Sequence, residues 1–152
     1  VGNKGLVIEK VDGPSHLKVV EEFGYEMYMH CGAIRKVLLA WQTPAFIDEY
    51  FKNIILHDQA FPHVRPDDLR EELKKIRQDG YAITHGEYVT DALGIGAPVF
   101  NSDGELAGSI GIIAPEIRVD TPEFLDTQKD LVQFYASSLS ADLGYEKHDV
   151  FQ

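Results

Sequence analysis

The stretch GYAITHGEYVTDALGIGAPVFNSDGELAGSIGIIAP, residues 80–115, decides the fold class of this chain. It contains three short apolar runs with the length and composition of β-strands, at residues 81–84, 94–100 and 105–113. The second and third runs are joined by Asn-Ser-Asp-Gly at residues 101–104, which is typical of a tight hairpin turn. The segment therefore predicts an antiparallel sheet.

Helices are predicted on both sides of this segment. Residues 33–41 place apolar side chains at i, i+3, i+4 and i+7, and Pro44 interrupts this period before it returns over residues 46–54. Residues 66–79 begin with a proline and two aspartates, and they stop at Gly80, the residue type that most often ends a helix. The chain therefore combines helices with an antiparallel sheet in an α+β fold.

Both ends of the chain also carry predicted elements. Two short strands are expected at residues 6–11 and 17–20, separated by turn residues at 12–15. A final helix is expected after Thr121, whose hydroxyl can cap the first turn. One side of this last helix carries Phe124, Gln128, Leu131, Tyr135 and Leu139.

The composition is that of one globular domain, residues 1–152, with 44% hydrophobic and 26% charged residues. The 14 Lys and Arg residues face 25 Asp and Glu residues, which gives a formal net charge of −11. A surface of this charge repels a phosphate backbone, so the chain by itself is not expected to bind nucleic acid. Cys31 is the single cysteine, and the sequence shows neither a signal peptide nor a long apolar span, so we expect a cytoplasmic protein.

Four glycines interrupt the two predicted hairpin strands: Gly94, Gly96, Gly108 and Gly111. Glycine weakens a strand, and it is typical of places where another backbone or a ligand approaches the sheet closely. The alternative is that these glycines mark bulges or corners of the sheet. Residues 94–96 are too short to be a dinucleotide-binding fingerprint, because no third glycine opens a helix after them.

Five segments in order carry a more specific signal: HCGAIRKVLLA at 30–40, IRQDGYA at 76–82, APVF at 97–100, DGELAGSIGI at 103–112 and APEIRV at 114–119. Together they resemble the effector-binding, C-terminal domain of the IclR family of bacterial transcription regulators. The resemblance covers nearly the whole chain. Ordered agreement of this kind is more specific than any one motif alone.

The resemblance implies a GAF-like or profilin-like fold, in which helices flank a curved antiparallel sheet whose concave side binds a small organic effector. It also implies an N-terminal winged helix-turn-helix domain that is absent from this sequence, through which alone the regulator would contact DNA. Regulators that bind palindromic sites need two-fold symmetry, so we expect homodimers that can pair into tetramers. No cofactor and no membrane partner are expected.

The resemblance places the effector pocket at six positions: Ala33, Ile34, Thr84, Gly94, Gly111 and Ile113. Family members that bind small hydroxy- or keto-acids tend to carry an acid, a thiol or serines at the last four positions. This chain has fewer polar groups there, so we expect a roomier and more apolar cavity that binds a small organic or aromatic carboxylic acid. Leucine at either glycine is then expected to fill the cavity, and Thr84→Val to weaken binding.

Arg35 departs from the glycine that the family usually has at this position. One interpretation is that its guanidinium pairs with a ligand carboxylate. The interpretation favoured by the sequence is a solvated arginine beside Lys36 on the polar face of the helix. Effector binding is therefore predicted without a role for Arg35.

Two other classes of protein remain as alternatives. His30 beside Cys31, with His85 and Glu87 further along, could form an activated thiol or a metal site. Neighbouring residues on a strand point to opposite faces, which makes a nucleophile and base pair at residues 30 and 31 unfavourable, so we predict no catalytic residue and no bound metal. A GAF-like module that only mediates dimerisation, without a ligand, is the other alternative.

Overall fold

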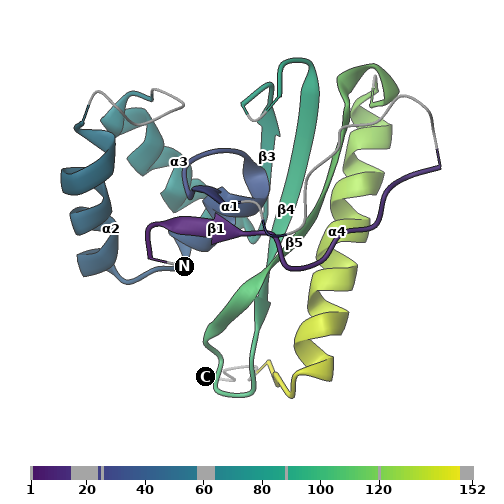
Figure 1. Ribbon diagram of the computed structural model, residues 1–152. Helices are drawn as coiled ribbons and strands as arrows, with labels where there is room; N and C mark the ends of the chain where they lie inside the picture. The colour runs from purple at the N-terminus through teal and green to yellow at the C-terminus, as the bar shows by residue number, and fades with distance from the viewer. Residues whose placement is uncertain are drawn as a thin grey trace.

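The computed structural model describes residues 2–14, 24, 26–57, 64–87, 89–119 and 121–147. Its centre is a three-stranded antiparallel sheet in the order β3–β4–β5, formed by Ala82–His85, Ala92–Phe100 and Leu106–Pro115 (Figure 1). Asn101 and the three residues after it form the turn between β4 and β5, where Gly104 has φ 77°. The predicted antiparallel sheet and its hairpin are confirmed.

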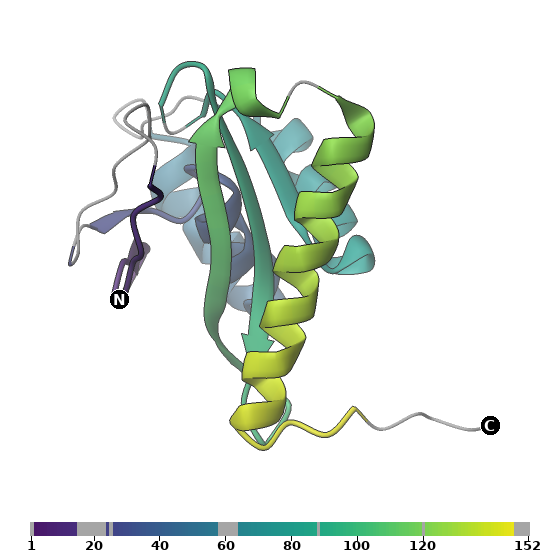
Figure 2. The same ribbon diagram turned by 90° about the vertical axis from the view of Figure 1, so that its right-hand side faces the viewer.

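Side-chain alternation along β4 gives the sheet two different faces. Leu93, Ile95, Ala97 and Val99 point to one face, where they pack with Val132 and Ala136 of α4 (Pro122–Asp142). Gly94 and Gly96 point to the other face, which is covered by α1 (Ala33–Ala40). The sheet is therefore enclosed between α1 and α4, and Figure 2 shows α4 running along its length.

The helices before the sheet form as predicted. After α1, Thr43 accepts a hydrogen bond from the Phe46 N–H and caps α2 (Pro44–Tyr50), which continues as the π-helical turn η1 (Phe51–Ile55). The helix α3 (Pro66–Asp79) ends at Gly80 in the left-handed conformation, with φ 79°. Its buried residues Leu69, Leu73 and Ile76 join one core cluster with residues of α1 and α2.

The N-terminal strand is shorter than expected and begins earlier. The structure pairs β1 (Lys4–Leu6) with β2 (Glu26–Tyr28) in a two-stranded antiparallel ribbon. The prediction of a strand at residues 6–11 was wrong beyond Leu6, because β2 offers only three partners and Ile8 and Val11 are exposed. The strand expected at residues 17–20 lies outside the described residues.

The last helix begins as predicted, with Thr121 accepting from the Phe124 N–H, but its apolar stripe faces away from the sheet. The buried side carries Val132, Ala136 and Ser140, and the Ser140 hydroxyl accepts from the Phe100 N–H at 2.9 Å. Small residues at these positions let the helix approach β4 closely. The aromatic and leucine side chains of the stripe are consequently left on the outer surface.

None of the described helices is both long enough and apolar enough to cross a membrane.

Candidate functional site

The first turn of α1 lies directly on the centre of β4, and two glycines make this possible. A Cβ atom on Gly96 would lie 2.9 Å from the Ile34 Cα and 3.0 Å from the Ala33 carbonyl oxygen. A Cβ on Gly94 would lie 3.0 Å from Thr84 Oγ1 and 3.3 Å from the Ala33 Cβ. Of the explanations for these two glycines, the structure supports the close approach of another backbone.

The two glycines of β5 have different roles. Gly108 lies opposite Val99, beside the register shift between Val99 and Phe100, and a Cβ there would have nothing within 4 Å. Gly111 lies opposite Gly96, and a Cβ there would overlap the Ile95 carbonyl oxygen and lie 2.7 Å from the Ile34 Cγ1. The bulge interpretation therefore applies to Gly108. At position 111 a glycine is needed because β4 and the Ile34 side chain pack directly against it.

A cavity of about 320 Å³, including its open mouth, lies at the N-terminal end of α1. Five of the six positions carried over from the resemblance line it together: Ala33, Ile34, Thr84, Gly94 and Ile113. Gly111 does not line this cavity, because the Ile34 side chain already occupies the space over that glycine. An effector contact at Gly111 stays a prediction.

The remaining lining residues are ones to which the sequence assigned no effector contact: Cys31, Gly32, Arg35, Glu87, Ala92 and Leu93. Three of them could be singled out from the sequence. Cys31 and Glu87 are chemically reactive residue types, and Arg35 departs from the pattern of the resemblance. Ala92 and Leu93 had no such feature beyond their place at the start of an apolar strand. The Leu93 side chain packs against α4, and this contact explains an apolar residue at position 93 without a ligand.

The cavity is smaller than the expected roomy pocket. The space inside it that a water-sized sphere can occupy is only about 20 Å³, room for about one water molecule, whereas ligand pockets commonly span about 300–1,000 Å³. The space that glycine leaves over Gly94 is taken by Thr84 and Ala33, and the space over Gly111 by Ile34. Glycine on these strands therefore admits the helix rather than enlarging the cavity.

Backbone groups and Thr84 shape the polar end of the cavity. The N-cap residue of α1 is Gly32, at φ 84° and ψ 163°, and it has no side chain with which to cap the helix. Thr84 Oγ1 accepts the Ala33 N–H at 3.0 Å from the neighbouring strand. The amide dipoles give this end of the helix a partial positive charge, which favours a negatively charged group.

Two basic side chains on α1 are buried, contrary to the expectation of a solvated polar face. Arg35 is 5% exposed and Lys36 is 2% exposed. Arg35 is covered by β1, where its Nε donates to the Gly5 carbonyl oxygen at 3.4 Å. Lys36 is covered by α3 and by the chain after β3. Helical periodicity alone did not reveal these neighbours, because they come from distant parts of the sequence.

Lys36 joins three parts of the fold through its ammonium group. Its Nζ lies 2.8 Å and 2.9 Å from the two carboxylate oxygens of Glu72 on α3, and it also forms an ion pair with Glu87 Oε1. Glu87 follows β3 and lines the cavity. The carboxylate nearest the cavity is therefore already engaged by a buried cation.

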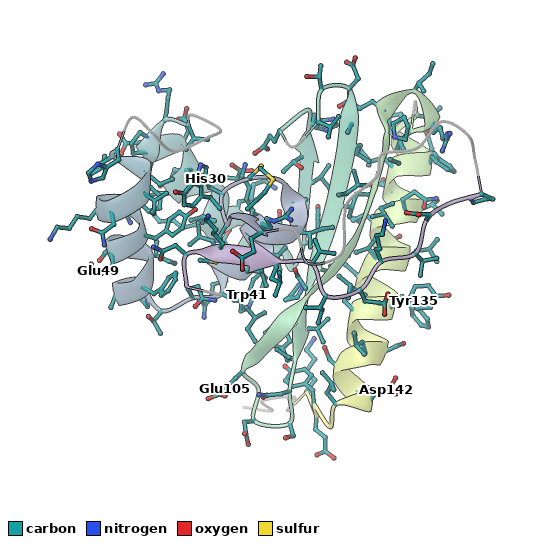
Figure 3. All side chains as sticks on the ribbon, in the orientation of Figure 1. His30, Trp41, Glu49, Glu105, Tyr135 and Asp142 are labelled. Carbon is teal, nitrogen blue, oxygen red and sulfur yellow. The ribbon has the colours of Figure 1, made fainter. Side chains whose placement is uncertain are left out.

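His30 is held by Tyr50 in the interior between β2 and α2 (Figure 3). The Tyr50 hydroxyl accepts the His30 backbone N–H at 3.3 Å and lies 2.7 Å from His30 Nδ1. The hydroxyl has one proton, and whether it donates that proton to Nδ1 or accepts from Nδ1–H depends on the tautomer of His30. Burial raises the pKa of the Tyr50 hydroxyl well above its usual value, which keeps that proton in place.

The structure does not gather the other residues of the enzyme alternative around His30. Cys31 Sγ lies 3.9 Å from both Met27 Sδ and the Glu87 carbonyl oxygen, and its side chain is fully buried. His85 Nδ1 lies 2.8 Å from Glu116 Oε1 on the exposed end of β3. Within the ranges that the structure describes, no group of three His, Cys, Asp or Glu side chains is arranged to hold a metal ion.

Comparison with known proteins identifies the class of domain. Residues 1–141 match the family model described as the bacterial transcriptional regulator IclR C-terminal domain. The chain belongs to the IclR family and corresponds to its C-terminal domain.

Two relatives and two solved structures illustrate the match. The HTH-type transcriptional regulator RhmR of Escherichia coli (strain K12) is 30% identical over 141 residues, covering 91% of this chain and 54% of RhmR. KipR of Bacillus subtilis (strain 168), also an HTH-type regulator, is 26% identical, covering 95% of this chain and 58% of its own length. The chain thus spans little more than half the length of these relatives.

The solved structures agree with the described fold. The Thermotoga maritima IclR crystal structure superimposes with a TM-score of 0.83 at 28% identity, covering 95% of this chain and 59% of that one. The C-terminal domain of E. coli KdgR gives a TM-score of 0.78 at 23% identity, covering 95% and 84%. The mixed fold of helices and antiparallel sheet is therefore that of IclR C-terminal domains.

Proposed function

We propose that this domain senses a small carboxylic acid in the cavity at the N-terminus of α1 and that it also holds a cytoplasmic transcription regulator together as a homo-oligomer. The observation that supports the sensing role is the convergence of five positions, expected from the family resemblance, on one cavity. The family membership supports the regulatory role. In this proposal the DNA contact belongs to a separate N-terminal domain.

The polar end of the cavity favours an acidic group. The first turn of α1 directs its amide dipoles toward this end. Glu87 does not oppose a negative ligand strongly, because Lys36 is already paired with its carboxylate. A carboxylate with its charge toward α1 fits these surroundings.

The apolar residues that line the cavity favour an apolar body. Ile34, Ile113 and Ala92 contribute aliphatic groups to its wall. Burying these groups against a ring or short chain is worth about 25 cal/mol for each Å² removed from water. Because the enclosed space is only about 20 Å³, the cavity has to widen to admit even a single aromatic ring or a short aliphatic chain.

Regulation follows if the acid binds one conformation of the domain better than another. A ligand shifts such an equilibrium only by its difference in affinity for the two states. The helix α1 is the element that changes most directly, since its first turn forms the cavity wall and its side chains contact β1 and α3. Altered placement of the DNA-binding domains is the proposed output.

Ligand binding is expected to raise the melting temperature of the domain. A carboxylic acid present at about a hundred times its dissociation constant adds roughly 2.7 kcal/mol to the free energy of unfolding. A thermal-shift series with benzoate, phenylacetate and short aliphatic acids measures this. Gly94→Ala adds a methyl group to the cavity floor within 3.0–3.3 Å of Thr84 and Ala33, so it is expected to reduce the shift.

The matched control is Gly108→Ala on β5, where the added methyl has nothing within 4 Å. This variant is expected to respond to the acid as the wild type does. A ligand response that Gly94→Ala leaves unchanged would place the site elsewhere. A domain that self-associates but responds to none of the acids would support the alternative of a dimerisation module without a ligand.

The self-association role is supported by the outer face of α4. Six large apolar side chains on and just after this helix are between 38% and 62% exposed: Phe124, Leu131, Phe134, Tyr135, Leu139 and Leu143. Figure 3 shows Tyr135 pointing away from the sheet. Exposed apolar patches of this kind are typical of interaction surfaces, and a helix face can meet its own copy across a two-fold axis.

Replacing two residues of this face with charged ones is expected to dissociate the oligomer. Sedimentation equilibrium of the wild type is expected to give a dimer or tetramer, and Leu131→Glu combined with Tyr135→Glu to give a monomer with a normal circular dichroism spectrum. Ile117→Glu is the control, since Ile117 is equally apolar and 75% exposed but lies on η2 (Glu116–Arg118). A wild type that stays monomeric at high concentration would contradict the self-association role.

A further inference from the structure

We propose that α4 packs against α4 of a second copy of this chain in antiparallel orientation, with Tyr135 close to the two-fold axis. The inference rests on the proposed self-association. It adds to that role the direction of the two helices and the side chains that meet between them. It does not depend on the ligand, because α4 covers the face of the sheet opposite to α1.

The outer face of α4 is open to a partner along the helix. α4 meets the sheet through its opposite side, which carries Val132, Ala136 and Ser140. Figure 2 shows α4 in front of the sheet, and no other described helix or strand crosses its outer side in that view. The large apolar side chains there, each between 38% and 62% exposed, are therefore available for contact between copies.

The outer face has the residue spacing of a seam between two helices. Gln128, Leu131, Tyr135, Ser138 and Asp142 follow one another at alternating intervals of three and four residues. Side chains at these intervals keep one side of a long helix toward a partner helix. The face is therefore suited to a helix that runs alongside α4 rather than to one that crosses it.

Two aromatic rings occupy the middle of the outer face. The centroids of the Phe134 and Tyr135 rings lie 5.3 Å apart, with an angle of 82° between the rings. This edge-to-face contact holds both rings in place. They are 62% and 59% exposed, more than any other large apolar side chain of α4. Because aromatic residues near the centre of an interface commonly contribute most of its binding energy, we place the two-fold axis close to Tyr135.

The residues on the two sides of Tyr135 complement one another when one helix is reversed. Reversal about Tyr135 places Leu131 against the partner's Leu139, and Gln128 against the partner's Asp142. The first contact buries apolar surface, and in the second the Gln128 amide can donate a hydrogen bond to the carboxylate. The two-fold axis repeats both contacts, so each of them occurs twice in the dimer.

The distribution of charge along α4 disfavours the parallel alternative. Its first half carries Glu123, Asp126 and Asp130 against the single cation Lys129, whereas Asp142 is the only charged residue of its second half. A parallel pair, with helix axes about 8–10 Å apart, would bring both acidic halves within the distance of about 10 Å over which surface charges repel at ~0.1 M salt. It would also place Asp142 against its own copy. An antiparallel pair separates the acidic halves and sets the two helix dipoles in opposite directions.

The test measures the distance between nitroxide spin labels on the two copies of α4. A single cysteine is introduced as Asp126→Cys or as Ser137→Cys, in a chain whose buried native thiol is removed by Cys31→Ser. Positions 126 and 137 are both exposed and lie on the same edge of α4, beside the seam. Double electron–electron resonance gives the distance between the two labels, and sedimentation of each labelled chain verifies that it self-associates.

The antiparallel pair predicts a longer distance at position 126 than at position 137. At about 1.5 Å per residue, the two copies of residue 126 lie about 27 Å apart along the helices, and those of residue 137 only about 6 Å. The distance at position 126 is therefore expected to exceed that at position 137 by more than about 10 Å. Leu131→Glu combined with Tyr135→Glu is the control, and it is expected to abolish both distances.

Three results would overturn the inference. Equal distances at the two positions, or a shorter one at position 126, would exclude the antiparallel pair, while the proposed self-association stands. Distances that survive the double glutamate substitution would place the interface on another surface of the domain. If the wild type sediments only as a monomer, the self-association role fails and the inference fails with it.

Discussion

Gly111→Ala is expected to lower the free energy of unfolding of this domain by more than about 3 kcal/mol. The added Cβ would overlap the Ile95 carbonyl oxygen, which is part of the β4 backbone, and would lie 3.0 Å from the Gly96 Cα. Backbone atoms cannot move aside as a flexible side chain can, so β4 and β5 would have to separate. The Ile34 Cγ1, at 2.7 Å, would also be displaced, and with it the first turn of α1. Urea unfolding followed by circular dichroism measures the change.

Gly108→Ala provides a matched control on the same strand. It introduces the same methyl group and the same change in unfolded-state entropy, but nothing lies within 4 Å of its Cβ. Its stability is expected to lie within about 1 kcal/mol of wild type. Equal stabilities of the two variants would show that β4 and β5 do not pack against α1 as described.

Lys36→Met is expected to cost about 2–3 kcal/mol of stability. Methionine matches the length of the lysine stem but leaves the carboxylates of Glu72 and Glu87 without their shared cation. Removing one partner of a buried ion pair usually costs about 3–5 kcal/mol, and the partial exposure of both glutamates reduces that figure. Chemical denaturation at low ionic strength measures the loss.

Two further variants isolate the cause of that loss. Lys74→Met removes a lysine from the exposed face of α3, and it is expected to change stability by less than about 0.5 kcal/mol. Adding Glu87→Gln to Lys36→Met removes one of the two uncompensated charges, so part of the stability is expected to return. If Lys36→Met lowered the free energy of unfolding no more than Lys74→Met does, the ion pairs of Lys36 would not contribute to stability, and they would not hold α3 against α1.

The local pattern predicted the sheet and the helices because the signals for them lie within a few residues. The turn at residues 101–104 joins the hairpin strands, and the proline at position 66 and Gly80 mark both ends of α3. The burial of Arg35 and Lys36 could not be predicted in this way. Their neighbours Gly5, Glu72 and Glu87 come from other elements, and periodicity along α1 carries no information about them.

The same distinction applies to the site and to α4. The resemblance predicted five of the residues that line the cavity. It also included Gly111, where a side chain from α1 fills the space above the glycine. The apolar stripe of α4 would ordinarily indicate a core-facing side. Here the side of α4 that faces the sheet carries the small residues Ala136 and Ser140, because small side chains let the helix lie closer to β4.

The most direct test of the account is a methyl NMR titration of isoleucine-labelled protein with benzoate and phenylacetate. Ile34 and Ile113 line the cavity. Ile76 lies on the buried face of α3, and Ile117 is exposed on η2. If the acids bind in the cavity, the Ile34 and Ile113 methyl signals shift saturably, those of Ile76 and Ile117 change little, and Gly94→Ala binds more weakly. Saturable shifts at Ile76 or Ile117 with Ile34 and Ile113 unmoved, or no saturable shift at any of the four, would contradict it.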